Sequence, residues 1–208
     1  MKIITGDAIK QITDFLEHMV NPVHIKLFIT EGEPSDVTKQ LLEELTSFNN
    51  KLTLETFDFS KNNEKASEYG LTGAPSFVLL DDKLENKGIL YSGIPLGHEI
   101  NSLLSGIIDV SGYPIAFDEE TLNAIKAIDK EVSIKVFVTM SCPYCPGAVS
   151  TAHRLALLNP NIKAEMVDAQ TFNDEAVKYD VTGVPKIVFN NNEASFLGDQ
   201  PVIEFINT

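Results

Sequence analysis

The stretch VSIKVFVTMSCPYCPGAVSTAHRLALL, residues 132–158, decides the fold. Its first part is an apolar run rich in β-branched residues, which predicts a buried strand. Its last part places apolar residues at helical spacing. Between the two lies the tetrad Cys142-Pro143-Tyr144-Cys145. We therefore expect this tetrad at the point where a buried strand ends and a helix begins.

The spacing of the two cysteines suits thiol chemistry. Unpaired backbone N–H groups and the positive end of the dipole at a helix N-terminus favour a thiolate at Cys142. Cys145, one turn on, would face Cys142 within disulfide reach, and Pro143 near the first turn costs the helix no hydrogen bond. A disulfide that closes so short a loop adds little stability. In this context CxxC is typical of a redox motif, and Cys142 and Cys145 are the predicted catalytic residues.

Three other roles for the pair stay open from the residues alone. A zinc half-site needs further ligands, but the chain has no other cysteine and its four histidines form no close pair. The other two roles are a structural disulfide or inert core cysteines, and a glutaredoxin-type iron–sulfur cluster shared with external glutathione. No GxGxxG pattern occurs. We therefore expect no metal and no bound cofactor, with electrons supplied by an external reductase or a small thiol.

A second motif, Thr182-Gly183-Val184-Pro185, directly precedes an apolar run about forty residues after the cysteines. In redox folds of the βαβ…ββα type, such a proline is cis and faces the disulfide. The backbone N–H and C=O of the preceding residue then stay free to pair with a substrate strand. Val184 and Pro185 are the predicted substrate-binding residues.

The chain contains an internal repeat. VHIKLFIT (23–30) matches VSIKVFVT (132–139) at an offset of 109, and residues 52–78 match 162–188 with nine of 27 positions identical. Each copy is predicted to run helix, strand, helix, strand, helix, strand, strand, helix. The first copy places these at 6–20, 23–30, 35–49, 52–59, 62–70, 75–82, 88–92 and 97–110. The second places them at 118–130, 132–139, 143–158, 162–168, 171–179, 185–190, 194–198 and 200–206.

The predicted fold class is therefore α/β, with two tandem units that each have a mixed central sheet flanked by helices. The boundary is expected at Ser111-Gly112-Tyr113-Pro114, which gives units 1–112 and 115–208. The first unit has no thiol, because the offset of 109 places Glu33-Pro34-Ser35-Asp36 where the second has its CxxC.

Composition narrows the range of partners. The chain has 208 residues, a formal net charge of −14 and one arginine among its basic residues, which argues against nucleic acid. No apolar run is long enough to span a membrane, and the N-terminal residues do not form a signal-peptide core. We expect a cytoplasmic protein without a membrane partner.

The whole chain resembles the glutaredoxin-like protein disulfide oxidoreductases, which carry two thioredoxin-fold units in tandem. The resemblance rests on MVNPV (19–23), SGIPLGHEI (92–100), IIDVS (107–111), ETLNAIKAID (120–129), VFVTMSCPYCPGAV (136–149) and TGVPKIVF (182–189). The chain is also similar to the N-terminal domain of the flavoprotein component of alkyl hydroperoxide reductase in PLGHE (95–99), LNP (158–160) and TGVP (182–185). These resemblances imply that Cys142 attacks, Cys145 resolves and Pro185 is the cis-proline.

The resemblance also implies a function. We expect a thiol–disulfide oxidoreductase that acts on protein disulfides through a single CPYC site and receives electrons from a flavoprotein reductase of the thioredoxin-reductase type. An electron carrier for a peroxiredoxin and a redox-sensing binding module are the alternatives. Thioredoxins use a buried aspartate six residues before the first cysteine, but that position is Val136 here. The hydroperoxide reductase resemblance implies Glu99 as the proton relay instead.

Overall fold

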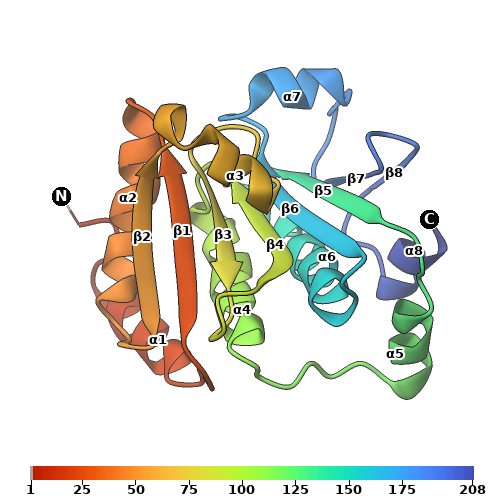
Figure 1. Ribbon diagram of the computed structural model, residues 1–208, viewed down its shortest axis with the longest axis horizontal. Helices are drawn as coiled ribbons and strands as arrows, with labels where there is room; N and C mark the ends of the chain where they lie inside the picture. Colours follow the sequence, from red (N-terminus) through yellow and green to blue (C-terminus); the bar gives the residue numbers. More distant parts are fainter. Residues whose placement is uncertain (1) are drawn as a thin grey trace.

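The computed structural model describes residues 2–208, and within them the strands form one mixed sheet in the order β2-β1-β3-β4-β6-β5-β7-β8 (Figure 1). The strands are β1 (Val23–Ile29), β2 (Leu52–Asp58), β3 (Ser76–Leu80), β4 (Asn86–Ser92), β5 (Val132–Val138), β6 (Ile162–Asp168), β7 (Lys186–Phe189) and β8 (Ala194–Leu197). The helices are α1 (Asp7–Leu16), α2 (Glu33–Thr46), η1 (Phe59–Lys61), α3 (Asn63–Tyr69), η2 (Gly97–Glu99), α4 (Ile100–Val110), α5 (Glu119–Lys126), α6 (Cys145–Leu158), α7 (Asn173–Lys178) and α8 (Val202–Asn207).

The predicted α/β class with mixed strand pairing is confirmed. In the first half β1 pairs parallel with β2 and antiparallel with β3, which pairs antiparallel with β4. The second half repeats this pattern with β5, β6, β7 and β8. The two halves are not separate sheets, because β4 and β6 pair in parallel from Ile89↔Ala164 to Ser92↔Val167. We propose that the halves are the units 1–112 and 115–208; residue 1 lies outside the described residues.

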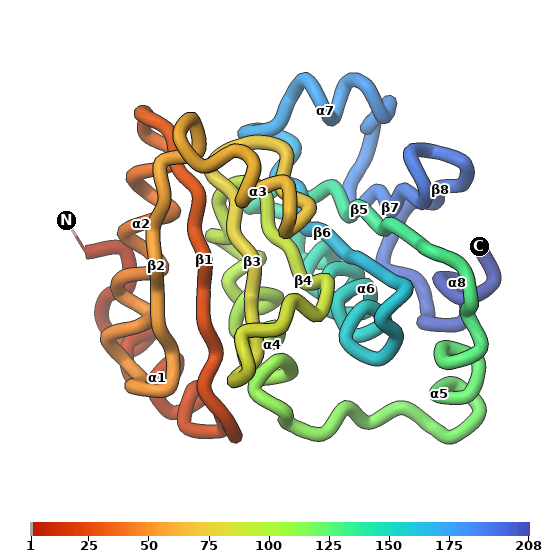
Figure 2. Tube along the Cα trace, in the orientation of Figure 1, coloured from red at the N-terminus to blue at the C-terminus, as the bar shows by residue number. Residues whose placement is uncertain are grey.

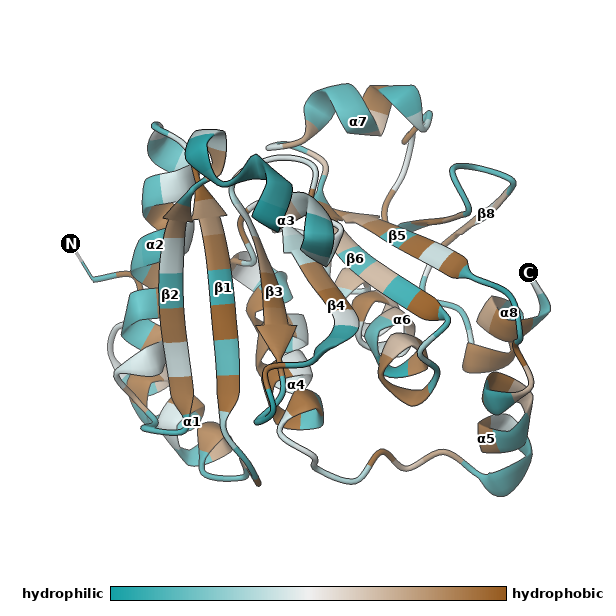
Figure 3. Cartoon of the chain, viewed as in Figure 1, coloured by the Kyte–Doolittle hydropathy of each residue, from teal (hydrophilic) through white to brown (hydrophobic). Residues whose placement is uncertain are grey.

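Helices cover both faces of the sheet. The main core lies on one face and includes buried residues of α1, α2, α4 and α6. On the other face, α3 and α7 each cover a small core of their own, one around Phe28 and one around Phe137. Figure 3 shows the matching pattern: α3 and α7 are mainly hydrophilic, whereas β3, buried along its whole length, is hydrophobic. The segment from α4 to α5 runs along one end of the molecule (Figure 2).

Several helices differ from the predicted ranges at their ends. The first ends at Leu16 rather than at 20, because His18 and Met19 donate to carbonyls three residues back and tighten the chain. The helix predicted at 118–130 is α5, Glu119–Lys126; the Asn159 side chain, which donates to the carbonyls of Ile125 and Ile128, satisfies its end. The range 97–110 divides into η2 and α4.

We call the junction of β4 and β6 the seam. It combines backbone pairing with buried polar contacts: Ser92 donates to Glu165, and Glu165 forms an ion pair with Lys135. Tight packing also holds it, because a Cβ atom at Gly88 would collide with the Ile162 carbonyl oxygen. The seam therefore joins the halves as closely as strands within one half.

Residues 115–208 expressed alone are expected to unfold at a lower urea concentration than the full chain. Without β4, strand β6 becomes an edge and loses hydrogen bonds worth about 1 kcal/mol each, and α6 loses its contact with α4. We also expect some thiol activity to persist. Urea unfolding and insulin reduction by both proteins test this. Equal stability and equal rate would show that the first half contributes to neither.

His153 of α6 predicts a pH effect on stability. Its Nε2 lies 3.2 Å from the Leu90 carbonyl oxygen across the seam, and burial lowers the pKa of His153 to about 4. Since an unfolded histidine protonates near pH 6.5, the unfolded state takes up more protons as pH falls, and stability declines. Between pH 7 and 4.5, wild type should lose about 2 kcal/mol relative to His153→Gln in urea titrations. Parallel pH profiles for the two proteins would contradict this.

Candidate redox site

The two cysteines form a disulfide between the end of β5 and the start of α6, with their Cα atoms 5.5 Å apart. The prediction that the two cysteines lie close enough to form a disulfide is confirmed. The helix start is not at 143, because α6 begins at Cys145 and Pro146 occupies its first turn. Cys142 therefore lies in the loop before the helix, where its N–H donates to the Thr139 carbonyl.

The disulfide is accessible from one side. Cys142 retains 7% exposure, whereas Cys145 is fully buried. Pro143 and Tyr144 between them are exposed, and the Tyr144 side chain is among the most exposed large hydrophobic groups at 69%. Of the two cysteines, Cys142 is therefore the one that a second thiol can approach.

The loop before β7 contains the expected cis peptide bond. The Val184–Pro185 peptide is cis, and Val184 takes part in no backbone hydrogen bond within the described residues. The loop is held from the other side, because Gly198 N–H donates to the Pro185 carbonyl. The neighbouring Leu197 lies near Gly183 and is 51% exposed. Free backbone groups beside an exposed apolar side chain can accept an extended peptide.

The first half repeats the cis-proline loop but has no cysteine. Its Ala74–Pro75 peptide is also cis, and Gly93 N–H donates to the Pro75 carbonyl as Gly198 does to Pro185. At the position of the cysteine tetrad, Glu33-Pro34-Ser35-Asp36 forms the first turn of α2 and offers no thiol. Phe172 from the second half packs against Gly73, where a Cβ atom would collide with the ring. This loop is therefore partly covered.

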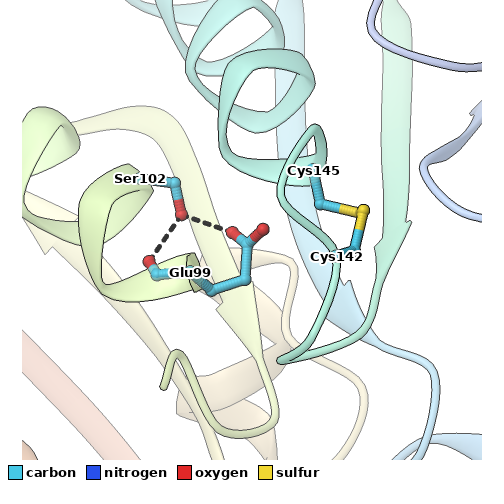
Figure 4. The surroundings of a disulfide bond; sticks show 4 residues. All are labelled: Glu99, Ser102, Cys142 and Cys145. Atoms are coloured by element: carbon cyan, nitrogen blue, oxygen red, sulfur yellow. Dashed lines mark hydrogen bonds between the residues drawn. A yellow bond between two sulfur atoms is a disulfide. The ribbon is translucent and has the colours of Figure 1, made fainter. Parts of the chain in front are cut away.

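Glu99 comes from the first half and lies at the redox centre of the second. His98 N–H donates to the Met140 carbonyl, which fixes η2 two residues before Cys142. Gly97 permits this approach, since its φ is 63° and a Cβ atom there would collide with the Met140 carbonyl. Figure 4 shows the Glu99 side chain pointing toward the disulfide. The geometry thus brings Glu99, Cys142 and Cys145 together.

The Glu99 carboxyl group is buried and incompletely hydrogen-bonded. Its exposure is 0%, Oε2 accepts a hydrogen bond of 2.5 Å from Ser102, and within the described residues Oε1 has no partner. Burial raises the pKa of Glu99 to about 7; the Ser102 hydrogen bond opposes this shift, and the negative charge of Asp168 adds to it. Such a group exchanges protons near neutral pH.

Solved structures with the same fold include two of high similarity over almost the whole chain. The N-terminal domain of the alkyl hydroperoxide reductase AhpF from Enterococcus faecalis has a TM-score of 0.90 and 30% identity, with 96% of each chain covered. The chain belongs to the same family as this AhpF domain. A protein disulfide oxidoreductase from Aeropyrum pernix is also similar, with a TM-score of 0.88, 28% identity and coverage of 98% of this chain and 91% of that one.

Comparisons of the sequence support membership of the same family. Residues 132–208 match the model of a thioredoxin domain. The AhpF protein of alkyl hydroperoxide reductase from Pseudomonas putida is 29% identical over 86% of this chain and 32% of its own length. A protein named NADH dehydrogenase from Ferdinandcohnia aciditolerans is 30% identical over 94% of this chain and 35% of its own length. The chain thus spans about a third of the length of these curated relatives.

The chain is therefore a thioredoxin-fold oxidoreductase similar to the N-terminal domain of AhpF, and its redox centre is the Cys142–Cys145 disulfide. No helix among the described residues is both long and apolar enough to cross a membrane. Within residues 2–208, no group of three or more histidine, cysteine, aspartate or glutamate side chains is placed to hold a metal ion.

Neither Ser102 nor Asp168 was expected at the site from the sequence. Ser102 lies three residues after Glu99, a spacing that places two side chains on one helix face, and this was a usable signal. Asp168 matches Asp58 in the repeat, but nothing in the sequence shows that only Asp168 is buried. Its burial depends on the seam.

Proposed function

We propose that this protein exchanges disulfides with protein substrates through Cys142 and Cys145. The observation that carries the proposal is that Cys142 is slightly exposed and follows the end of β5, which pairs with the start of β7, where the cis-proline loop leaves the backbone groups of Val184 free. Cys142 is the attacking thiol and Cys145 the resolving thiol. Val184 and Pro185 form the place where the substrate strand pairs.

In the first step, the Cys142 thiolate attacks one sulfur of the substrate disulfide. A bond forms between Cys142 and the substrate, the substrate S–S bond breaks, and the released substrate thiolate takes up a proton. In the second step, the Cys145 sulfur attacks Cys142. The Cys142–Cys145 bond forms, the mixed disulfide breaks, and the second substrate thiolate leaves. Two electrons pass from the Cys142/Cys145 dithiol to the substrate disulfide.

Glu99 serves the second step as the proton acceptor. Cys145 must lose its proton as its sulfur attacks, and the Glu99 carboxylate points toward the cysteine pair (Figure 4). The proton then passes from the Glu99 carboxyl group to the departing substrate thiolate or to solvent. A carboxyl group whose pKa is raised to about 7 accepts and releases this proton at neutral pH.

The second candidate is narrower: an electron carrier that reduces a peroxiredoxin and is itself reduced by a flavoprotein. The similarity to AhpF of alkyl hydroperoxide reductase over almost the whole chain favours it. Rapid mixing of the reduced protein with an oxidised peroxiredoxin and, separately, with insulin distinguishes the candidates. A rate to the peroxiredoxin at least about 100-fold higher supports the carrier, and similar rates support a general disulfide oxidoreductase.

A redox-sensing binding module is the third alternative. It predicts slow exchange with any disulfide, together with client binding that differs between the oxidised and reduced protein. Exchange with insulin or a peroxiredoxin at catalytic rates, lost in Cys142→Ser, contradicts it. Tight redox-dependent binding without turnover would instead contradict the exchange reaction proposed above.

A further inference from the structure

Asp199 lies between the cis-proline loop and the start of α6. It directly follows Gly198, whose N–H donates to the Pro185 carbonyl. Its carboxyl group lies against Gly147 in the first turn of α6, so closely that a Cβ atom at Gly147 would collide with it. The helix itself begins at Cys145, two residues before this contact. Asp199 therefore touches the helix of the cysteine pair and adjoins the loop where the substrate strand is proposed to pair.

The half without cysteines has no acid at this place. There Gly93 donates to the carbonyl of the cis-proline, and the next residue, the counterpart of Asp199, is Ile94. The offset of 109 that aligns the cysteine tetrad places Thr38 at the position of Gly147. The buried Thr38 hydroxyl donates to the Gly93 carbonyl at 3.4 Å, so a side chain of the helix takes up the space. Only the half with the redox centre combines a glycine in the helix with a carboxyl group packed against it.

The Asp199 carboxyl group has no polar partner among the described residues, neither an ion pair nor a hydrogen bond. The lysine that directly follows the cis-proline, Lys186, does not neutralise it, because its Nζ donates to the carbonyls of Tyr179 and Asp180. Asp199 as a whole is exposed, yet partial burial of its carboxyl group raises the pKa above its usual value. An accessible carboxylate that is partly withdrawn from water and unpaired gains free energy from a cation that another molecule brings.

We propose that Asp199 determines substrate preference: its carboxylate pairs with a lysine or arginine side chain of the protein segment that lies against the cis-proline loop. This inference rests on the proposed disulfide exchange and names the class of substrate. Leu197, two residues earlier and 51% exposed, lies near the same loop and offers an apolar contact to that segment. The preferred substrate is therefore a protein disulfide with a basic residue beside its cysteine.

The test compares two peptides, each with one internal disulfide, that differ only in having lysine or glutamate beside each cysteine. Single-turnover reduction by the reduced full chain gives a second-order rate constant for each peptide. Wild type should reduce the lysine peptide about tenfold faster at low ionic strength, because opposite charges near a surface attract and like charges repel. Asp199→Asn should lower this ratio about threefold or more, Asp199→Lys should lower it further, and Asp199→Glu should retain most of it. Added salt should weaken the preference of wild type.

A matched control removes the same charge elsewhere. Asp82 is exposed in the turn between β3 and β4 of the first half, at the opposite end of β3 from the cis-proline. Asp82→Asn should leave the ratio of the two rate constants unchanged. It therefore separates a local contact at Asp199 from the general attraction of basic peptides by a chain with a net charge of −14.

Three outcomes would overturn the role of Asp199. If Asp199→Asn changes both rate constants by the same factor, the charge acts on the cysteine pair rather than on the substrate. If Asp82→Asn lowers the ratio as much as Asp199→Asn, the preference comes from the net charge of the chain. In both cases disulfide exchange itself stands. If wild type reduces neither peptide, disulfide exchange is overturned, and the role of Asp199 with it.

Discussion

Replacing Cys142 by serine is expected to abolish insulin reduction, whereas Cys145→Ser is expected to accumulate mixed disulfides and release them slowly. Cys142 retains some exposure and Cys145 has none, so only Cys142 can meet a substrate sulfur first. Without Cys142 no first bond forms, and turnover should fall to the level of buffer. Without Cys145 the first bond forms, but no internal thiol breaks it.

Two measurements check this pair of variants. Insulin turnover gives the loss of activity, and non-reducing electrophoresis shows the adduct of Cys145→Ser, which dithiothreitol should dissolve. Alkylation of the reduced wild type by iodoacetamide at neutral pH should modify Cys142 before Cys145. Residual turnover in Cys142→Ser, or earlier labelling of Cys145, would reverse the assignment of the two thiols.

The second large effect is expected for Glu99→Gln, which should slow resolution of the mixed disulfide by about 10² to 10⁴ at neutral pH. Gln keeps the shape of the side chain and the hydrogen bond from Ser102, but it cannot accept the Cys145 proton. The loss of a nearby negative charge should also let the Cys142 thiolate form at lower pH. Stopped-flow resolution rates and the ultraviolet absorbance of the thiolate measure the two effects.

A stability change must be separated from a catalytic one in Glu99→Gln. Because the buried carboxyl group costs free energy when ionised, Gln should make the protein more stable above pH 7, not less. Slower resolution in a protein of equal or higher stability therefore points to lost proton transfer. Unchanged resolution together with an unchanged thiolate titration would leave water as the proton acceptor.

Much of the fold could be predicted because the same pattern of strands and helices occurs twice in the sequence. The repeated strand patterns and the TGxP motif indicated two units, each with a parallel pair of strands and an antiparallel closing pair. The continuous sheet was not predictable, since the pairing of β4 with β6 depends on Gly88 and Gly93 leaving room for the other half. A glycine in a strand can mark a close approach, but it does not show which surface will pack against it.

The residues of the site also differ in whether the sequence could predict them. Cys142, Cys145 and Pro185 lie in local motifs whose spacing alone indicates their geometry. Glu99 was reached only through a family resemblance, because the cysteine pair that it faces belongs to the other half of the chain. Asp168 was not predicted to lie near the site. In the sequence it matches Asp58 of the other repeat, and only the packing at the seam makes the surroundings of the two aspartates differ.

The most direct test of disulfide exchange is a single-turnover reaction between the fully reduced protein and an equal amount of an oxidised protein disulfide, quenched with acid and analysed by mass spectrometry. We expect one Cys142–Cys145 disulfide to form for each substrate disulfide reduced, with a transient adduct that maps to Cys142. Transfer without such an adduct, an adduct that maps to Cys145, or no transfer to either insulin or a peroxiredoxin would contradict it.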